Sequence, residues 1–107
     1  MADIPRLTEA AFEAEVLKSS LPVMIDFTAT WCGPCRMLDP VLSQLAQDWA
    51  GKVKIVKLDV DDNNNLTLKY GVMGVPTLIL FIAGTPVQRL SGYQPKDRIV
   101  SKFSSYI

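Results

Sequence analysis

The most restrictive feature of this sequence is an apolar run of strand length that leads directly into a helix whose first turn carries two cysteines. Residues 22–29 (PVMIDFTA) are almost continuously apolar, which is typical of a strand covered on both faces. From 34 to 49 the apolar residues recur at helical spacing, and a leading proline suits a first helical turn. The pattern predicts a buried strand, a short loop and a helix that begins at Cys32-Gly33-Pro34-Cys35.

The remaining segments alternate between helix and strand patterns. We expect a helix over 9–18 capped by Thr8, strands over 53–60, 77–84 and 87–93, and helices over 63–71 and from about 96 to the C-terminus. A turn at 84–86 makes the last two strands an antiparallel hairpin, whereas strands separated by helices favour parallel pairing. The sequence therefore predicts an α/β fold, with a mixed sheet of four to five strands and about four helices on its two faces.

Length and charge limit the possible partners. The 107 residues suffice for one domain, 1–107. Eleven basic and eleven acidic side chains give zero net charge, which argues against nucleic acid, whose binding needs a basic surface. No apolar stretch approaches the ~20 residues of a membrane helix. The acidic N-terminal stretch differs from a signal peptide, so we expect a cytoplasmic protein.

The counts of histidine and cysteine exclude most catalytic classes. Histidine is absent, so Ser/His/Asp and Cys/His hydrolases and imidazole metal sites are excluded. The only cysteines are Cys32 and Cys35, which supply half the ligands of a zinc site and are too few for a secreted disulfide scaffold. The sequence predicts no metal and favours a redox pair.

The expected position of the two cysteines gives them different roles. Residues three apart on a helix lie about 5–6 Å apart at Cβ, so a small movement would close a disulfide. Free N–H groups and the positive end of the helix stabilise a thiolate at Cys32. Cys35, further inside, should stay protonated longer, and Trp31 can shield the pair. One thiol would attack and the other would resolve the mixed disulfide.

The whole chain resembles the thioredoxin family. The residues that carry this resemblance are Asp26-Phe27, Trp31-Cys32-Gly33-Pro34-Cys35, Pro40, Asp59, Gly74-Val75-Pro76-Thr77, Gly84 and Gly92. The resemblance implies a general protein disulfide reductase that works through a mixed disulfide and binds no cofactor itself. Its partners would be disulfide-containing proteins and a thioredoxin reductase, either an NADPH-dependent flavin enzyme or a ferredoxin-dependent one. We also expect a monomer without nucleic-acid or membrane contacts.

The resemblance also assigns roles to residues around the cysteines. Asp26 would be a buried acid that takes or relays the proton of Cys35, with the ammonium of Lys57 nearby. From the residues alone, a carboxylate satisfied by polar neighbours is the favoured interpretation of Asp26, and Lys57 could equally be a surface lysine. Trp31, Gly33, Pro34 and a cis Pro76 would support the dithiol. Trp31, Gly74, Val75, Pro76 and Gly92 would form the substrate groove.

Four positions, Thr28, Thr30, Asp39 and Met73, depart from the usual bacterial pattern. Thr28 stands where tryptophan is common, beneath the active-site loop. Asp39 lies on roughly the same helix face as both cysteines; its charge opposes thiolate formation if it is close to them and matters little if it is solvated. Met73 replaces a residue that is often basic and makes the rim of the groove more apolar. These changes concern redox potential and partner preference rather than the reaction.

Two other functions remain open at this point. A disulfide oxidase or isomerase usually carries histidine between the cysteines, which Gly33-Pro34 lacks. A binding or chaperone-like subunit of the same fold would act independently of its thiols, and a double Cys→Ser variant that kept its full biological effect would favour it.

Overall fold

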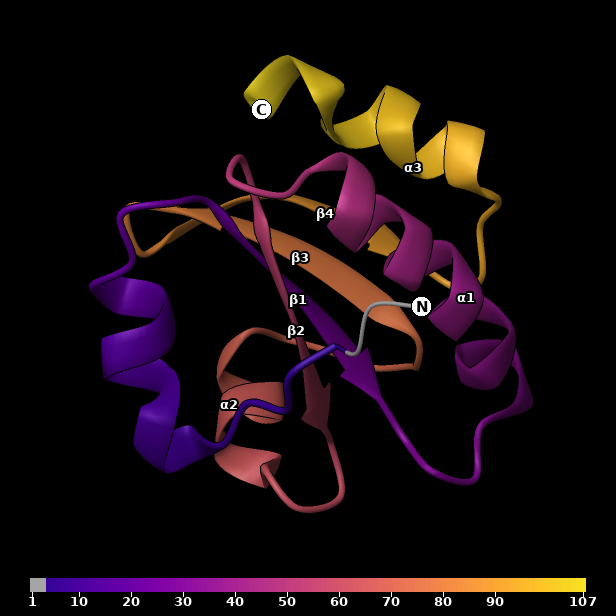
Figure 1. Ribbon diagram of the computed structural model, residues 1–107. Helices are drawn as coiled ribbons and strands as arrows, with labels where there is room; N and C mark the ends of the chain where they lie inside the picture. Colours follow the sequence, from indigo (N-terminus) through magenta and orange to yellow (C-terminus); the bar gives the residue numbers. More distant parts are fainter. Residues whose placement is uncertain (1–3) are drawn as a thin grey trace.

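A mixed four-stranded sheet forms the centre of residues 4–107, the part of the chain that the computed structural model describes (Figure 1). Its strands are β1 (Val23–Thr28), β2 (Lys54–Asp59), β3 (Thr77–Ile82) and β4 (Thr85–Ser91), in the spatial order β2-β1-β3-β4. β1 runs parallel to β2 and antiparallel to β3, and β3 and β4 form an antiparallel hairpin. The predicted α/β class, mixed sheet and hairpin are confirmed.

The direction of β3 corrects the expectation that strands separated by helices run parallel. Asp59, the last residue of β2, and Thr77, the first of β3, both lie beside the carboxyl end of β1. The intervening residues 60–76 contain one short helix, α2 (Asn64–Lys69). The chain enters β3 at the edge of the sheet where it left β2, so β3 runs antiparallel to β1.

Helices cover both faces of the sheet. α1 (Gly33–Asp48) and α3 (Lys96–Phe103) lie on one face, and the N-terminal helical segment and α2 lie on the other (Figure 1). Two apolar clusters correspond to these layers, and each takes alternate residues of β1 and β2. The α1/α3 cluster includes Met24, Leu38, Leu42, Ile55, Leu80, Ile99 and Phe103, and the opposite cluster includes Phe12, Val16, Ile25, Phe27, Val56, Leu58 and Phe81.

The segment before β1 is less regular than the predicted helix over 9–18. It consists of a 3₁₀ turn, η1 (Glu9–Ala11), and a π-helical stretch, η2 (Glu13–Leu17), in which Lys18 N–H donates to the carbonyl of Glu13. Thr8 caps the first turn as expected by accepting from Ala11 N–H. The possible fifth strand is a single parallel bridge between Arg6 and Lys57, and residues 1–3 lie outside the described part.

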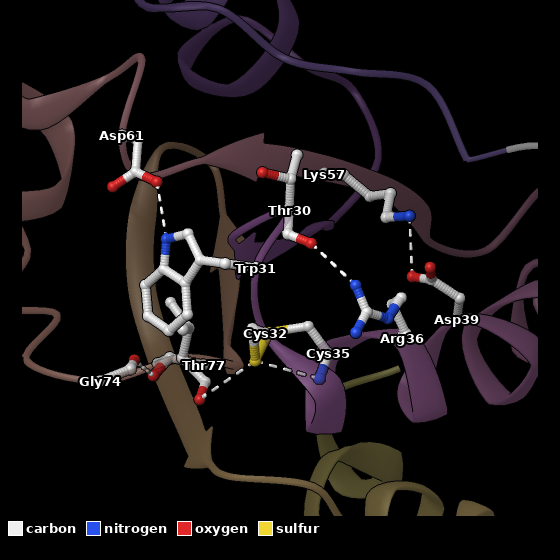
Figure 2. Close-up of a disulfide and its surroundings, with 11 residues drawn as sticks. Thr30, Trp31, Cys32, Cys35, Arg36, Asp39, Lys57, Asp61, Gly74 and Thr77 are labelled. Atoms are coloured by element: carbon white, nitrogen blue, oxygen red, sulfur yellow. Dashed lines mark hydrogen bonds and ion pairs between the residues drawn. A yellow bond between two sulfur atoms is a disulfide. The ribbon is translucent and has the colours of Figure 1, made fainter.

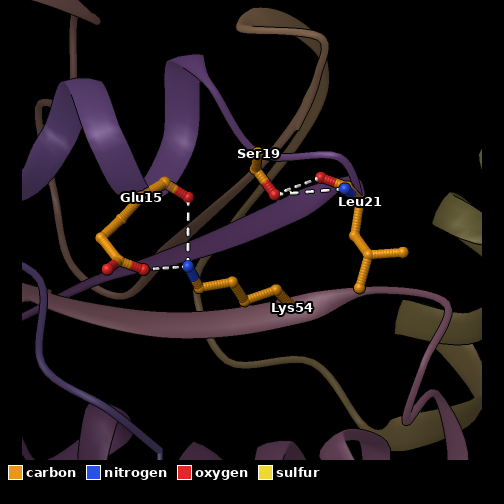
Figure 3. A network of polar contacts seen from close by, with 4 residues as sticks. All are labelled: Glu15, Ser19, Leu21 and Lys54. Carbon is orange, nitrogen blue, oxygen red and sulfur yellow. Dashed lines mark hydrogen bonds and ion pairs between the residues drawn. The ribbon is translucent and has the colours of Figure 1, made fainter.

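Polar contacts hold this segment against the sheet. The ammonium of Lys54, on β2, contacts both the carboxylate and the backbone carbonyl of Glu15 (Figure 3). The Ser19 hydroxyl donates to the carbonyl of Leu21 and accepts from its N–H, which shapes the turn into β1. These contacts fix the entry into the strand that leads to the cysteines.

The hairpin turn lies earlier than predicted. Ala83 and Gly84 separate the two strands, and their φ angles are +51° and +80°. Positive φ at both central residues is typical of the two-residue turns whose twist matches that of the flanking strands. Thr85 and Pro86, assigned to the turn from sequence, belong to β4; proline is tolerated there because β4 is an edge strand.

The cap of α2 does not come from the residues just before the helix. The Asn63 side chain makes no cap hydrogen bond and instead accepts from Glu9 N–H and donates to the Asp59 carbonyl. The carboxylate of Glu9 accepts from the N–H groups of Asn65 and Leu66. A residue distant in sequence therefore caps α2 and ties it to the N-terminal segment.

Candidate active site

Cys32 and Cys35 lie where β1 leads into α1, at the carboxyl edge of the sheet. They form a disulfide with a Cα–Cα distance of 5.3 Å (Figure 2). Cys32 is the N-cap residue of α1, and its Sγ accepts from Cys35 N–H at 3.2 Å. Both residues are buried, Cys35 slightly more than Cys32 at 1% and 4% exposure. The strand, loop and helix predicted from sequence thus place the Cys32 sulfur against free N–H groups of a helix N-terminus.

The loop before β3 passes beside the disulfide. The Val75–Pro76 peptide bond is cis, as the resemblance implies, and the Val75 carbonyl oxygen is 3.8 Å from the Cys32 Sγ. Gly92 N–H donates to the Pro76 carbonyl, and the Thr77 hydroxyl donates to the carbonyl of Gly74, both at 2.7 Å. Two strands therefore anchor the loop that faces Cys32.

Two shallow grooves meet at this loop. One, about 420 Å³, includes Gly74, Val75, Pro76 and Gly92 in its lining, and a smaller one, about 170 Å³, includes Trp31, Gly74 and Val75. All five residues predicted for substrate binding thus lie on one continuous surface. Gly92 has φ +80°, a conformation that strains other residues.

The indole of Trp31 does not cover the cysteines as a buried shield. Its side chain is 67% exposed, and its Nε1–H donates to the Asp61 carboxylate at 2.8 Å (Figure 2). Met73, across the smaller groove, is 98% exposed. The rim around Cys32 is therefore apolar and accessible, with Trp31 held by one hydrogen bond.

Asp26 is the most unusual group near the disulfide. It lies on the same face of β1 as Met24 and Thr28, which is the face covered by α1, and it is fully buried. Among residues 4–107 neither of its carboxylate oxygens has a hydrogen-bond partner, which contradicts the reading of a carboxylate satisfied by polar neighbours. Loss of hydration raises its pKa from 3.8 to about 7, while the charge of Lys57 lowers the pKa and that of Asp39 raises it.

Lys57 lies next to Asp26 in the parallel register of β1 and β2, but its ion pair is with another acid. The Lys57 ammonium is 2.7 Å from Oδ1 of Asp39, on α1 (Figure 2). The two side chains are 19% and 40% exposed, so Asp39 is ion-paired and only partly solvated. The resemblance implies a Lys57 ammonium near Asp26, and neither the resemblance nor the residue pattern revealed the pair with Asp39.

A cavity of about 200 Å³ lies beside the Lys57–Asp39 ion pair. Its lining includes Thr28, Cys35, Asp39 and Lys57, together with Arg6, Arg36 and Asp59. Arg36 closes one side by donating to the Thr30 carbonyl at 3.0 Å (Figure 2). Thr28 is buried and lines this open space, which agrees with the expectation that it replaces a larger side chain.

Sequence reasoning missed two residues of this surface. Asp61 holds Trp31, and its only sequence signal is its place in the acidic stretch after β2. The Arg89 guanidinium, on β4, donates to the carbonyls of Tyr70 and Gly71 and lines the larger groove. Nothing in the alternating pattern of β4 distinguished Arg89 from a solvent-facing residue.

The described residues contain no cluster of three or more cysteine, aspartate or glutamate side chains arranged to hold a metal ion. None of the helices within 4–107 has the length and apolarity needed to span a membrane.

Two sulfurs that close a disulfide within one helical turn, beside an accessible groove, exchange electrons with other thiols and disulfides. The fold and site therefore define a thiol-disulfide oxidoreductase. The thioredoxin family model matches residues 3–105. The chain is similar to thioredoxins of Synechocystis sp. (43% identity over the full length of both), Alicyclobacillus acidocaldarius (46%, covering 94% and 95%) and Staphylococcus aureus (45%, covering 97% and 98%). The chain belongs to the thioredoxin family, and its activity is that of a protein-disulfide reductase.

Proposed function

We propose that Cys32 is the attacking thiol and Cys35 the resolving thiol of a general disulfide reductase. The observation that carries this assignment is the position of Cys32 as N-cap of α1, with its sulfur accepting from Cys35 N–H and lying beside the Val75 carbonyl. The helix N-terminus favours a thiolate at Cys32 over one at Cys35, whose sulfur lies further inside.

The reaction transfers two electrons from the dithiol to the substrate. The Cys32 thiolate attacks one sulfur of a substrate disulfide and displaces the other as a thiolate, which leaves a mixed disulfide. Cys35 loses its proton and attacks the Cys32 sulfur. The bond between Cys32 and the substrate breaks, the second substrate thiolate departs, and the protein is left with the Cys32–Cys35 disulfide.

Asp26 accepts the Cys35 proton, directly or through water in the adjoining cavity. In a chain without histidine, a carboxylate whose pKa burial raises to about 7 is matched to proton transfer at neutral pH. Lys57 tunes this acid by its charge. The support is the location of Asp26 on the face of β1 beneath α1, in register with Lys57, which lines a cavity together with Cys35.

The grooves beside Cys32 receive an extended segment of the substrate. The Val75 backbone would pair with this segment, while Gly74, Pro76 and Gly92 leave room for it and Trp31 contacts it from the other side. Gly33 and Pro34 shape the first turn of α1 between the cysteines. The apolar rim at Met73 favours substrates with apolar residues near the disulfide.

The oxidised protein is reduced by a thioredoxin reductase, with electrons from NADPH through a flavin or from ferredoxin. No cofactor binds to the chain itself, which works as a monomer in a reducing compartment such as the cytoplasm. The support is chemical: a disulfide formed in each cycle has to be reduced before the next one.

Reduction of insulin disulfides tests this proposal, first with dithiothreitol and then with a reductase and NADPH. Cys32→Ser should abolish turnover. Cys35→Ser should attack once and accumulate as a mixed disulfide with the substrate, visible by non-reducing electrophoresis. Trapping by Cys32→Ser but not by Cys35→Ser would reverse the two roles. Full biological effect in the double Cys→Ser variant would instead support a thiol-independent binding role.

A further inference from the structure

Three interacting charged groups, rather than a simple pair, lie between α1 and the strands β1 and β2. Asp26 and Lys57 are register partners on adjacent parallel strands, and Asp39 faces them from α1. A lysine has one ammonium on a flexible stem, so a close ion pair with one carboxylate withdraws it from the other. The Lys57 ammonium is with Asp39, and both oxygens of Asp26 are left without a hydrogen-bond partner among residues 4–107.

We propose that Asp39 is a positioning residue that holds the Lys57 ammonium away from Asp26, so that Asp26 remains a strong proton acceptor for Cys35. The proposal rests on the proposed role of Asp26 in the resolving step. It goes beyond a role for Lys57 alone. In this proposal the protonation state of Asp26 also depends on Asp39, which lies on α1 four residues after Cys35 in sequence.

The geometry favours this arrangement over a fortuitous surface pair. The Lys57 side chain is only 19% exposed and lines the same cavity as Asp39, so most of it is shielded from bulk water. β3 contributes apolar Leu78 as the register partner of Asp26, and therefore no competing charge.

The other charged groups of the cavity are Arg6, Arg36 and Asp59. Arg36 donates to the Thr30 carbonyl, and the Asp59 carboxylate accepts from Asp61 N–H. Arg36 and Asp59 thus already have backbone partners, whereas neither oxygen of Asp26 has a hydrogen-bond partner among residues 4–107.

The consequence for Asp26 has a definite sign. An ammonium that approaches a buried carboxylate stabilises its charged form and lowers its pKa. Asp39 also acts on Asp26 directly as a like charge and raises its pKa. Removing the Asp39 charge should therefore lower the Asp26 pKa by both routes, and only the route through Lys57 depends on a lysine at position 57.

The experiment measures the Asp26 pKa by carboxyl-carbon NMR titration of the full chain in the oxidised state. Asp39→Asn should lower this pKa by about one pH unit or more, and Asp39→Glu should restore it. Asp48→Asn is the matched control, because Asp48 also lies on α1 and pairs with a lysine, Lys96, at 2.7 Å; it should leave the Asp26 pKa unchanged. An unchanged Asp26 pKa in Asp39→Asn overturns the proposal.

A second background separates positioning from simple repulsion. In Lys57→Met, the further change Asp39→Asn should lower the Asp26 pKa by clearly less than it does in the parent. An equal decrease in both backgrounds means that Asp39 acts only by its own charge, which overturns the positioning role. Circular dichroism spectra matching the parent establish that the variants compared are folded.

The resolving step is then followed kinetically. The rate of substrate release from a preformed Cys32 mixed disulfide is measured as a function of pH. In Asp39→Asn the acidic limb of this profile should shift to lower pH, by the same amount as the Asp26 pKa measured by NMR. If the pKa moves and the profile does not, the positioning role is supported and the proposed proton transfer to Asp26 is overturned.

Discussion

Replacing Asp26 by alanine should stabilise the oxidised protein at pH 8, although it removes atoms from the core. Folding transfers this carboxyl from water to a site with no hydrogen-bond partner among residues 4–107 and raises its pKa from 3.8 to about 7. A raised folded pKa means that the folded state holds the proton more tightly than the unfolded chain does. The contribution of Asp26 to stability is therefore complete below pH 3.8 and is lost as the pH rises through about 7.

The magnitude follows from the size of the pKa difference. Each pH unit corresponds to about 1.4 kcal/mol, so a difference of about three units destabilises the folded parent by about 4 kcal/mol at pH 8. At pH 4, where only the unfolded chain is substantially ionised, the same calculation gives about 0.5 kcal/mol. The advantage of Asp26→Ala over the parent should shrink by about 3–4 kcal/mol between these two pH values.

Urea or guanidinium unfolding of both proteins, with the disulfide intact, measures this difference. Asp26→Asn is the matched control, since it keeps the shape of the side chain but does not titrate; it should lose the same pH dependence. The change between pH 4 and pH 8 is the decisive quantity, because any cavity left by alanine is present at both. A difference from the parent that is the same at both pH values would refute the reasoning and make Asp26 a structural carboxylate.

Three further changes test other parts of the structure. Thr28→Trp should be tolerated and change insulin reduction less than tenfold, because Thr28 borders a cavity of about 200 Å³; a loss of several kcal/mol in unfolding would show that the surroundings have repacked around threonine. Glu9→Ala should cost about 1–2 kcal/mol, since Glu9 caps α2, with reduction rates unchanged; Glu13→Ala, a more exposed acid of the same segment, should cost less. Arg89→Ala should raise the KM for protein disulfides more than it lowers kcat, because Arg89 holds the carbonyls before the Gly74 loop; equal rates for parent and variant would exclude that role.

The sequence predicted the elements that depend on local patterns. Continuous apolarity identified the buried strand β1, and helical periodicity after Pro34 identified α1, so the location of Cys32 at a helix N-terminus followed from the sequence. These inferences succeed because burial on two faces and the helical period leave regular traces in the order of residues. The resemblance to the thioredoxin family supplied the cis Pro76, which spacing alone does not reveal.

Predictions from local patterns were wrong where the same residues are compatible with several backbone conformations. The predicted turn began one residue and ended two residues after the observed Ala83-Gly84 turn, because Thr85 and Pro86 also suit turns. The helix before β1 has ordinary helical spacing, yet it forms a 3₁₀ turn and a π-helical stretch that pack against the sheet and α2. Such packing decides where elements begin and end, and the order of apolar and polar residues carries little information about it.

Only the tertiary structure decided which charges meet. Asp26, Lys57 and Asp39 come from three elements, and the sequence leaves open whether the ammonium joins one acid or the other; the distance between α1 and β2 determines that it lies 2.7 Å from Asp39. The cap of α2 is likewise a long-range contact, because Glu9 is 56 positions from Asn65 and 57 positions from Leu66 in the sequence. Electrostatic energy depends on distance and desolvation in space. The identity of the reacting sulfurs was therefore visible in the sequence, while the state of the acid beneath them depends on the folded arrangement.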